Sequence, residues 1–128
     1  MSEIQTIMTA DPTGQQLVQF AQTIAERLVK DQLTRGQIRN IFTEVRKIES
    51  LWEVDQEKAL RRLVMLKPKM DYQTARIPQV QRLKEVLAEA IDEVAKGKDN
   101  KEKDERFKRF MNLFEAVLAY HRAKGGRN

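Results

Sequence analysis

Three arginines, Arg35, Arg39 and Arg46, are spaced so that a helix would place them in one row. At ~100° per residue they fall within roughly 40° of one another, about 105° from the centre of the apolar stripe of the same segment. A guanidinium presents a planar fork of N–H donors that matches the oxygens of a phosphate. The row therefore indicates contacts with a phosphate backbone. The alternative is a solvated helix flank whose arginines pair with acids such as Glu49.

Basic residues are concentrated in two blocks of this 128-residue chain, whose formal net charge is +5. Residues 32–76 carry ten basic and six acidic side chains, and residues 107–128 carry five basic and one acidic. Clustered Lys and Arg attract polyanions, whereas evenly mixed charge mainly keeps a surface solvated. We therefore expect the two blocks to form a surface on two helices that faces a polyanion.

Residue types that catalyse reactions or bind metals are scarce. The chain has no cysteine and one histidine, His121, which excludes disulfides, thiolate metal sites and a cysteine nucleophile. His121 lies on an apolar helical pattern, where a packed or hydrogen-bonded residue is expected rather than a ligand. Gly125-Gly126 lacks the following helix and lysine of a phosphate-binding loop. We therefore predict no catalytic residue, no metal site and no cofactor, and the protein is not expected to be an enzyme.

Three aromatic side chains, Trp52, Tyr72 and Tyr120, have the chemistry to stack on nucleobases. Aromatic residues within helical patterns usually belong to a core or an interface instead. We expect the second situation for all three.

Apolar residues recur at three- and four-residue spacing along most of the chain, and no strand alternation is visible. Thr34 and Gln37 form a capping-box pattern at the start of the arginine-bearing helix. Pro68 is expected to end the next helix, and Gly97 to end a later one in a left-handed conformation. The expected helices span about residues 15–30, 34–50, 55–67, 69–75, 80–96 and 107–124.

This pattern predicts an all-α fold, a compact bundle of five principal helices plus a short connecting helix. Residues 1–13 show no apolar rhythm and are expected to be a flexible leader, followed by a single bundle domain over residues 14–124 and a tail over residues 125–128. The longest uncharged stretch, residues 12–25, is shorter than the about 20 predominantly apolar residues that a membrane-spanning helix needs, and it includes several polar side chains. No secretory signal is visible, so we expect a cytoplasmic protein without membrane contacts.

Four local patterns, in order over residues 34–126, are more specific than the general helical periodicity. They are Gln37-Ile38-Arg39 with Phe42 and Val45; Leu66-Lys67-Pro68-Lys69 with Tyr72 and Ala75-Arg76; Phe107, Phe110 and Phe114; and Glu115–His121 with Gly125-Gly126. Together they resemble the small all-helical subunit of the type III-A CRISPR (Csm) effector complex. One departure is Ala75, where that family often has a glycine before the arginine.

The resemblance implies a non-catalytic subunit that stacks along and stabilises the crRNA and the target RNA in antiviral defence. Its contacts would be made with the nucleic-acid backbone and would be independent of sequence, because base pairing already reads the sequence. Implied partners are other Csm subunits, namely the repeated backbone subunit and the large subunit, and further copies of the same chain. Target cleavage and nucleotide signalling would belong to those two other subunits.

The resemblance and the arginine row together give ten candidate RNA-binding residues. By resemblance the first are Arg39, Lys67, Lys69 and Arg76, the row adds Arg35 and Arg46, and the second basic block supplies Lys108, Arg109, Arg122 and Lys124.

Two other functions also fit the residues. The first is a stand-alone helical adaptor that binds a protein partner and whose basic blocks are incidental. The second is a helix-turn-helix DNA-binding protein, with its turn near Asp31–Gly36 and the arginine-bearing helix in the major groove.

Overall fold

The computed structural model describes residues 1–128 and contains only helices and the loops between them, which confirms the predicted all-α bundle of five principal helices. In chain order the elements are α1 (Glu3–Thr9), α2 (Gln15–Lys30), α3 (Arg35–Trp52), α4 (Gln56–Arg76), the 3-10 helix η1 (Pro78–Val80), α5 (Gln81–Ala95) and α6 (Asn100–Ala123). The short helix predicted over residues 69–75 is instead the last part of α4, and the 3-10 helix η1 joins α4 to α5.

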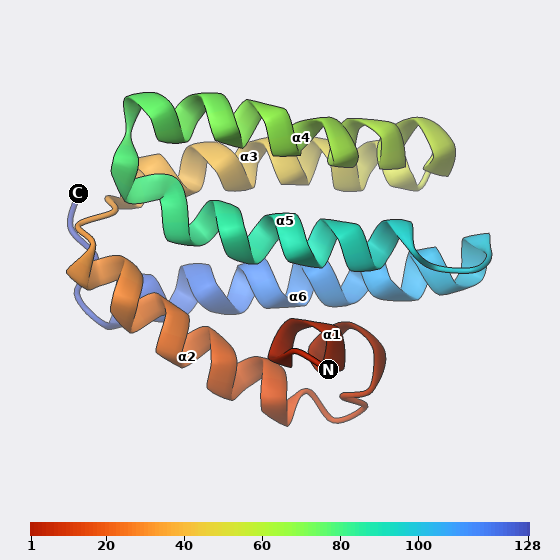
Figure 1. Ribbon diagram of the computed structural model, residues 1–128, viewed down its shortest axis with the longest axis horizontal. Coiled ribbons are helices and arrows are strands. Elements are labelled where there is room, and N and C mark those ends of the chain that lie inside the picture. Colours follow the sequence, from red (N-terminus) through yellow and green to blue (C-terminus); the bar gives the residue numbers. More distant parts are fainter.

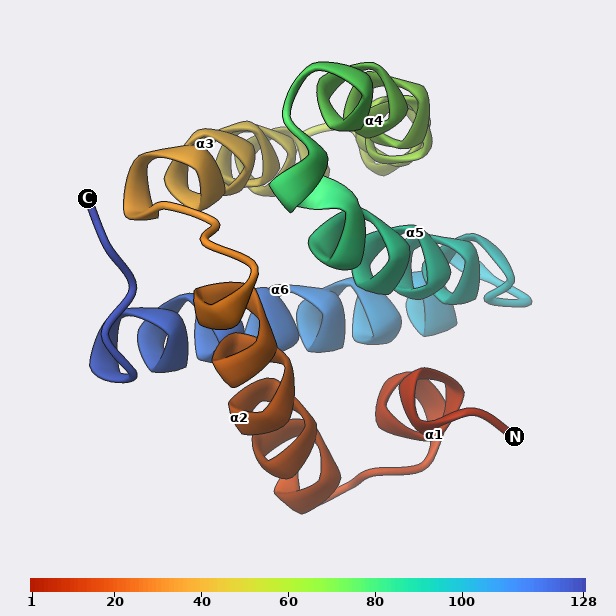
Figure 2. The ribbon, with the colours of Figure 1, turned by 60° about the vertical axis from the view of Figure 1, so that its left-hand side comes forward.

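The last helix, α6, lies at the centre of the bundle and packs against α1, α2, α3 and α5 (Figure 1). The antiparallel pair α3 and α4 covers one side of the bundle, and α2 crosses α6 on the other side (Figure 2). Because α4 packs mainly on α3, η1 and α5, it is a peripheral helix with a free outer face.

A single cluster of 30 buried apolar residues forms the core. The apolar stripe of α6 supplies Phe110 and Phe114, both fully buried. Trp52 stacks on Phe107 with ring centroids 4.1 Å apart, and its indole N–H donates to Asp104 at 2.9 Å. The expectation of a packed position is therefore confirmed for Trp52. This packing fixes α3 on α6, the two helices that carry most of the predicted arginines.

The predicted flexible leader is wrong for residues 3–9, which form α1. Ser2 accepts the N–H of Gln5, and the Gln5 side chain accepts the N–H of Ser2, which completes a capping box. Ile4, Ile7 and Met8 are buried and join the core, so the bundle begins before residue 14. Two turns of helix give too short a pattern to be recognised by periodicity, and the stability of α1 comes from tertiary packing.

The predicted helix end at Pro68 is also wrong, because α4 runs without a break from Gln56 to Arg76. Proline lacks an N–H and leaves the carbonyl of Val64 without its helical partner. Both residues are exposed, so water can satisfy that carbonyl. The chain turns only after α4, at Ile77 before Pro78.

Gly97 is needed for close packing and not for a left-handed backbone. Its φ is not positive, contrary to the prediction, and the positive-φ glycines are Gly14 and Gly125. A Cβ at Gly97 would lie 2.7 Å from Cγ of Lys103, in the first turn of α6. That helix begins earlier than predicted, with Asp99 as its N-cap accepting the N–H of Glu102 at 2.8 Å.

None of the helices combines the length and the apolar composition that crossing a bilayer requires.

Candidate nucleic-acid interface

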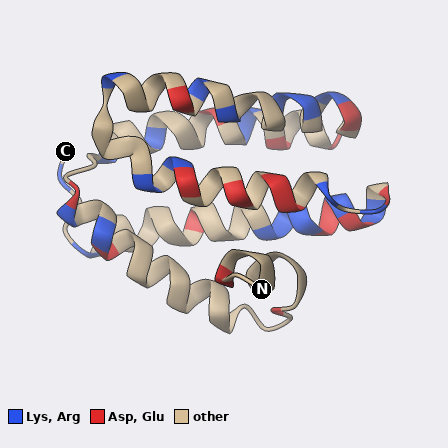
Figure 3. Cartoon of the chain, in the orientation of Figure 1, with Lys and Arg blue, Asp and Glu red and all other residues tan.

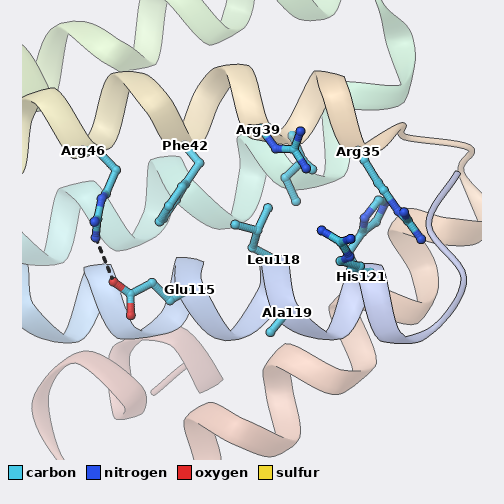
Figure 4. A pocket seen from close by; sticks show the side chains of 10 residues that line it. Arg35, Arg39, Phe42, Arg46, Glu115, Leu118, Ala119 and His121 are labelled. Atoms are coloured by element: carbon cyan, nitrogen blue, oxygen red, sulfur yellow. Dashed lines mark ion pairs between the residues drawn. The ribbon is translucent and has the colours of Figure 1, made fainter. Parts of the chain in front are cut away.

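The two basic blocks meet where α3 and α6 lie side by side. Side chains of these two helices line a groove with a volume of about 480 Å³. Four arginines border it, three from α3 and one from α6, and we call it the arginine groove: Arg35, Arg39, Arg46 and Arg122. Figure 4 shows Arg46 and Arg35 extending from α3 toward α6 and Arg39 lying beside α3, with Phe42 and Leu118 between the two helices. The predicted row therefore exists and borders one groove.

The first turn of α3 sets the direction of the row. Thr34 Oγ1 accepts the N–H of Gln37 at 3.1 Å, and the Gln37 side chain accepts the N–H of Thr34 at 2.9 Å, so the predicted capping box is confirmed. From there the three α3 arginines follow at steps of four and seven residues, about 6 and 10 Å along the helix axis. The rigid helix thus presents its guanidinium groups at fixed intervals.

Arg46 is the one groove arginine with carboxylate partners. Its Nη1 lies 3.3 Å from Glu49 and 3.6 Å from Glu115 of α6, and the pair with Glu49 is the one considered from the sequence. The Arg46 side chain is 57% exposed, and exposed ion pairs contribute little to stability. A phosphate can therefore replace these carboxylates at small cost.

The other three groove arginines, Arg35, Arg39 and Arg122, form no ion pair. Nε of Arg35 is shielded from solvent and has no hydrogen-bond partner. The groove thus holds three guanidinium groups without a counterion.

The end of α6 and the residues after it hold the start of α3 in place. His121 is fully buried, and its Nε2 lies 2.7 Å from the carbonyl oxygen of Leu33. Because a carbonyl only accepts, Nε2 carries the proton, and the packed, hydrogen-bonded role predicted for this histidine is confirmed. The carbonyl of Arg127 accepts the N–H of Arg35 at 2.7 Å. We call the unit of His121, Gly126 and Arg127 the C-terminal clasp.

A left-handed turn after α6 makes the clasp possible. Gly125 has φ +95°, as expected for the residue that ends this helix. Gly125 donates to the carbonyl of Arg122 and Gly126 to that of His121, the two bonds of a Schellman motif. The chain then returns over the His121 ring, where a Cβ on Gly126 would lie 2.3 Å from Nδ1.

A second basic surface lies on α4, away from the arginine groove. Lys69 and Arg76 border a hollow of about 560 Å³ together with Tyr72, and neither cation forms an ion pair. Tyr72 is 66% exposed, so it is not part of the core of this chain. The guanidinium carbon of Arg76 lies 5.9 Å from the centre of its ring.

Lys67 and Lys124 hold helices together. Lys67 pairs with Asp92, which ties α4 to α5, and Lys124 pairs with Glu26 at 3.0 Å, which ties α6 to α2. The structure therefore does not bring these two predicted residues to the groove as free cations.

Lys108 and Arg109 also have partners. Asp104 accepts a hydrogen bond from Lys108 at 3.0 Å, and this bond raises the pKa of the lysine. Nη1 of Arg109 donates to the carbonyl of Ile7 at 3.1 Å and so fixes α1 on α6. A hydrogen bond that the sequence did not predict joins Arg82 of α5 to Asp31 at the end of α2. It likewise ties two parts of the chain together, and it raises the pKa of Arg82.

Sequence reasoning missed two exposed arginines, Arg61 and Arg62, in the first half of α4. Arg62 precedes Lys69 by seven residues, as Lys69 precedes Arg76, so all three lie on one face of a continuous helix. The signal was present in the spacing, but a helix broken at Pro68 would have separated Arg62 from the other two.

Figure 3 shows where charge gathers: basic residues along α3 and α4, basic and acidic residues together in the first half of α6, and acidic residues along α5. No group of three or more His, Cys, Asp or Glu side chains is placed to hold a metal ion. The groove offers unpaired guanidinium donors beside an apolar floor. This arrangement is suited to binding phosphodiester anions without reading bases.

A protein-family model matches most of the chain. The family model described as Csm2 Type III-A matches residues 11–127, a range that contains every helix except α1. Neither the curated proteins nor the solved structures gave a match. The family match confirms the resemblance carried by the four sequence patterns, and the chain therefore belongs to the Csm2 Type III-A family, the small subunits of the type III-A CRISPR effector complex.

Proposed function

We propose that this protein holds the crRNA and the target RNA of the Csm complex through phosphate contacts made by the arginine groove, and that it catalyses no reaction. The carrying observation is that Arg35, Arg39 and Arg122 converge on one groove without any carboxylate partner. Unpaired guanidinium groups at fixed intervals favour a ligand with regularly spaced negative charges.

Rigidity supports the same function. The capping box at Thr34 and the C-terminal clasp both hold the first turn of α3, from which Arg35 extends. A guanidinium that is already ordered loses less side-chain entropy when a phosphate binds. Backbone contacts of this kind position a guide–target duplex, while pairing between the strands supplies specificity.

The ten candidate residues divide by their partners. Six are proposed to contact RNA: Arg35, Arg39, Arg46 and Arg122 in the groove, and Lys69 and Arg76 on α4. The other four, Lys67, Lys108, Arg109 and Lys124, already bond to groups of the same chain and are proposed to act mainly in packing.

Assembly determines the proposed setting. The protein would work in the cytoplasm, beside the repeated backbone subunit, the large subunit and further copies of itself. A stand-alone adaptor and a helix-turn-helix DNA-binding protein, both open from the sequence, fit a subunit of a ribonucleoprotein complex less well.

The test is to rebuild the Csm complex with Arg35, Arg39 and Arg122 changed to alanine and to measure target-RNA affinity at several salt concentrations. We expect weaker binding and a shallower salt dependence, by roughly 0.7–0.9 in the log–log slope for each phosphate that the variant no longer neutralises. Lysine at the same three positions restores the positive charge but not the planar fork of N–H donors. The lysine variant should therefore recover the salt dependence more fully than the affinity.

The matched control removes three positive charges at the opposite end of the bundle. Lys58, Lys98 and Lys101 are exposed, form no ion pair, and lie where α4 and α6 begin (Figure 1). Their alanine variant should keep the wild-type slope. An equal loss of affinity in both triple variants would show that net charge, and not the groove, holds the RNA.

A further inference from the structure

An exposed stripe runs along the flank of α4 that borders α3, where cations alternate with large apolar side chains. It consists of Arg62, Met65, Lys69, Tyr72 and Arg76, and we call it the α4 stripe. The spacing of three and four residues keeps all five side chains on one side of the helix. Met65 is 51% and Tyr72 is 66% exposed, so the apolar members are not covered by the fold.

The cations of the α4 stripe are free. Arg62, Lys69 and Arg76 form no ion pair, whereas Lys67 and Asp71, which point toward α5, both do. The three stripe cations repeat every seven residues, about 10 Å apart along the helix. One carboxylate, that of Glu44 on α3, lines the same hollows and pairs with Lys47, so the stripe keeps an excess of positive charge.

The tyrosine ring is placed between two of these cations. Arg76 lies over the ring of Tyr72, and the hollow beside it is also lined by Met65 and Lys69. An arginine beside an exposed ring is a recurrent arrangement where aromatic side chains stack on nucleobases, because the cation neutralises the neighbouring phosphate. An exposed ring of this size otherwise leaves apolar surface in water.

We propose that the α4 stripe binds an unpaired stretch of RNA, with Tyr72 stacked on a base and the stripe cations on the flanking phosphates. This inference rests on the proposed RNA-binding function and specifies, for the surface that includes Lys69 and Arg76, that the bound RNA is unpaired. Bases inside a duplex have both faces covered by their neighbours, so only an unpaired base can offer a face to Tyr72. The arginine groove needs no free base.

The test is a fluorescence titration of the full chain, at low salt, with a labelled 12-nucleotide single-stranded RNA and with a 12-base-pair RNA duplex. Tyr72→Ala should weaken single-strand binding about 5- to 150-fold, the range that corresponds to one base–aromatic stack. Tyr72→Phe should retain wild-type affinity, because stacking does not need the hydroxyl. Duplex affinity should be the same in all three proteins.

A single-stranded RNA without bases is the matched control ligand. It keeps the phosphates, so the wild type and Tyr72→Ala should bind it equally, while Arg62→Ala and Lys69→Ala should weaken binding. Tyr72 is exposed and its removal leaves no core cavity; a circular-dichroism melt equal to that of the wild type checks this.

Three results would overturn the inference: no single-strand binding by the wild type, an equal loss of affinity in Tyr72→Ala for the RNA without bases, or weakened binding in Tyr72→Phe. A fourth such result is a stripe variant that binds RNA as the wild type does but sediments differently, which would show that the stripe contacts protein. The groove variant with Arg35, Arg39 and Arg122 replaced separates the two proposals. It should lose duplex binding yet keep the dependence on Tyr72.

Discussion

Gly126 lies directly against the imidazole of His121, and the carbonyl of the following residue holds the first N–H of α3. The contact leaves no space for a side chain: a Cβ there would lie 2.2 Å from Cε1 of His121 and 2.7 Å from its backbone oxygen. Backbone cannot move aside as a flexible side chain can, so the tail itself would have to shift.

We therefore expect Gly126→Ala to break the bond between Arg127 and Arg35. Overpacking of this kind costs about 1–3 kcal/mol, and a thermal melt should show a lower Tm. Target-RNA affinity of the rebuilt complex should also fall, because the backbone that positions Arg35 is no longer held by the tail.

Gly36→Ala is the control for that substitution. A Cβ at Gly36 meets only the Thr34 hydroxyl oxygen, at 4.0 Å, and alanine is a better helix former than glycine by about 1 kcal/mol. This variant should be at least as stable as the wild type. A Gly126→Ala protein with an unchanged Tm would contradict the clasp.

Single residues also show what the sequence could predict about the site. The arginine row followed from helical spacing alone, because spacing fixes which residues share a face. The partners of Lys67 and Lys124 could not be predicted, since Asp92 and Glu26 lie on other helices and far away in the chain. Which cations are free is a property of the tertiary structure.

At the scale of elements, the turn between α2 and α3 carries an unusual backbone. Gln32 has φ 66°, a left-handed conformation that side chains with a Cβ rarely adopt. The turn is a second Schellman motif, with Gln32 donating to Val29 and Leu33 donating to Leu28. Leu33 is buried, and its carbonyl is the acceptor for His121.

Gln32→Gly should raise the free energy of unfolding by about 0.5–1 kcal/mol, because glycine adopts this φ without a Cβ clash. Urea unfolding measures the change. Gln32→Ala keeps the Cβ and removes only the amide, so it should bring no such gain. If alanine stabilised the protein as much as glycine, the backbone conformation would not be the cause.

The element predictions succeeded where amphipathic stripes were long and failed at two places. Pro68 was expected to end a helix, but its exposed position lets α4 continue. The α1 pattern of Ile4, Ile7 and Met8 is too short to stand out without the surfaces of α5 and α2 against which it packs. Both failures arise from tertiary context overriding a local signal.

At the scale of the whole molecule, α6 lies between two regions, one proposed to bind RNA and one expected to contribute mainly to stability. The arginine groove lies between α6 and α3, whereas α1, outside the residues matched by the family, packs against α2, α5 and α6 on the other side (Figures 1 and 2). Stability contributed by α1 should therefore be separable from RNA binding.

Ile7→Ala tests this separation. Ile7 is fully buried, so the truncation should cost about 2–5 kcal/mol in urea unfolding. The affinity of the still-folded protein for RNA should be unchanged in the rebuilt complex. Val54→Ala makes the same kind of truncation at a residue that is 84% exposed, and should change stability by no more than about 0.5 kcal/mol. A parallel loss of RNA affinity in Ile7→Ala would show that the two regions are coupled.

The C-terminal clasp has a practical consequence for spectroscopy. The chain has no cysteine, so one introduced at Asn128 would be the single thiol available for a fluorophore or a spin label. Because Arg127 is bonded to the first residue of α3, such a probe would stand beside the mouth of the arginine groove. The same dye attached near Met1 would lie across the bundle. A signal change at Asn128 alone would report binding at the groove, whereas equal changes at both positions would report motion of the whole complex.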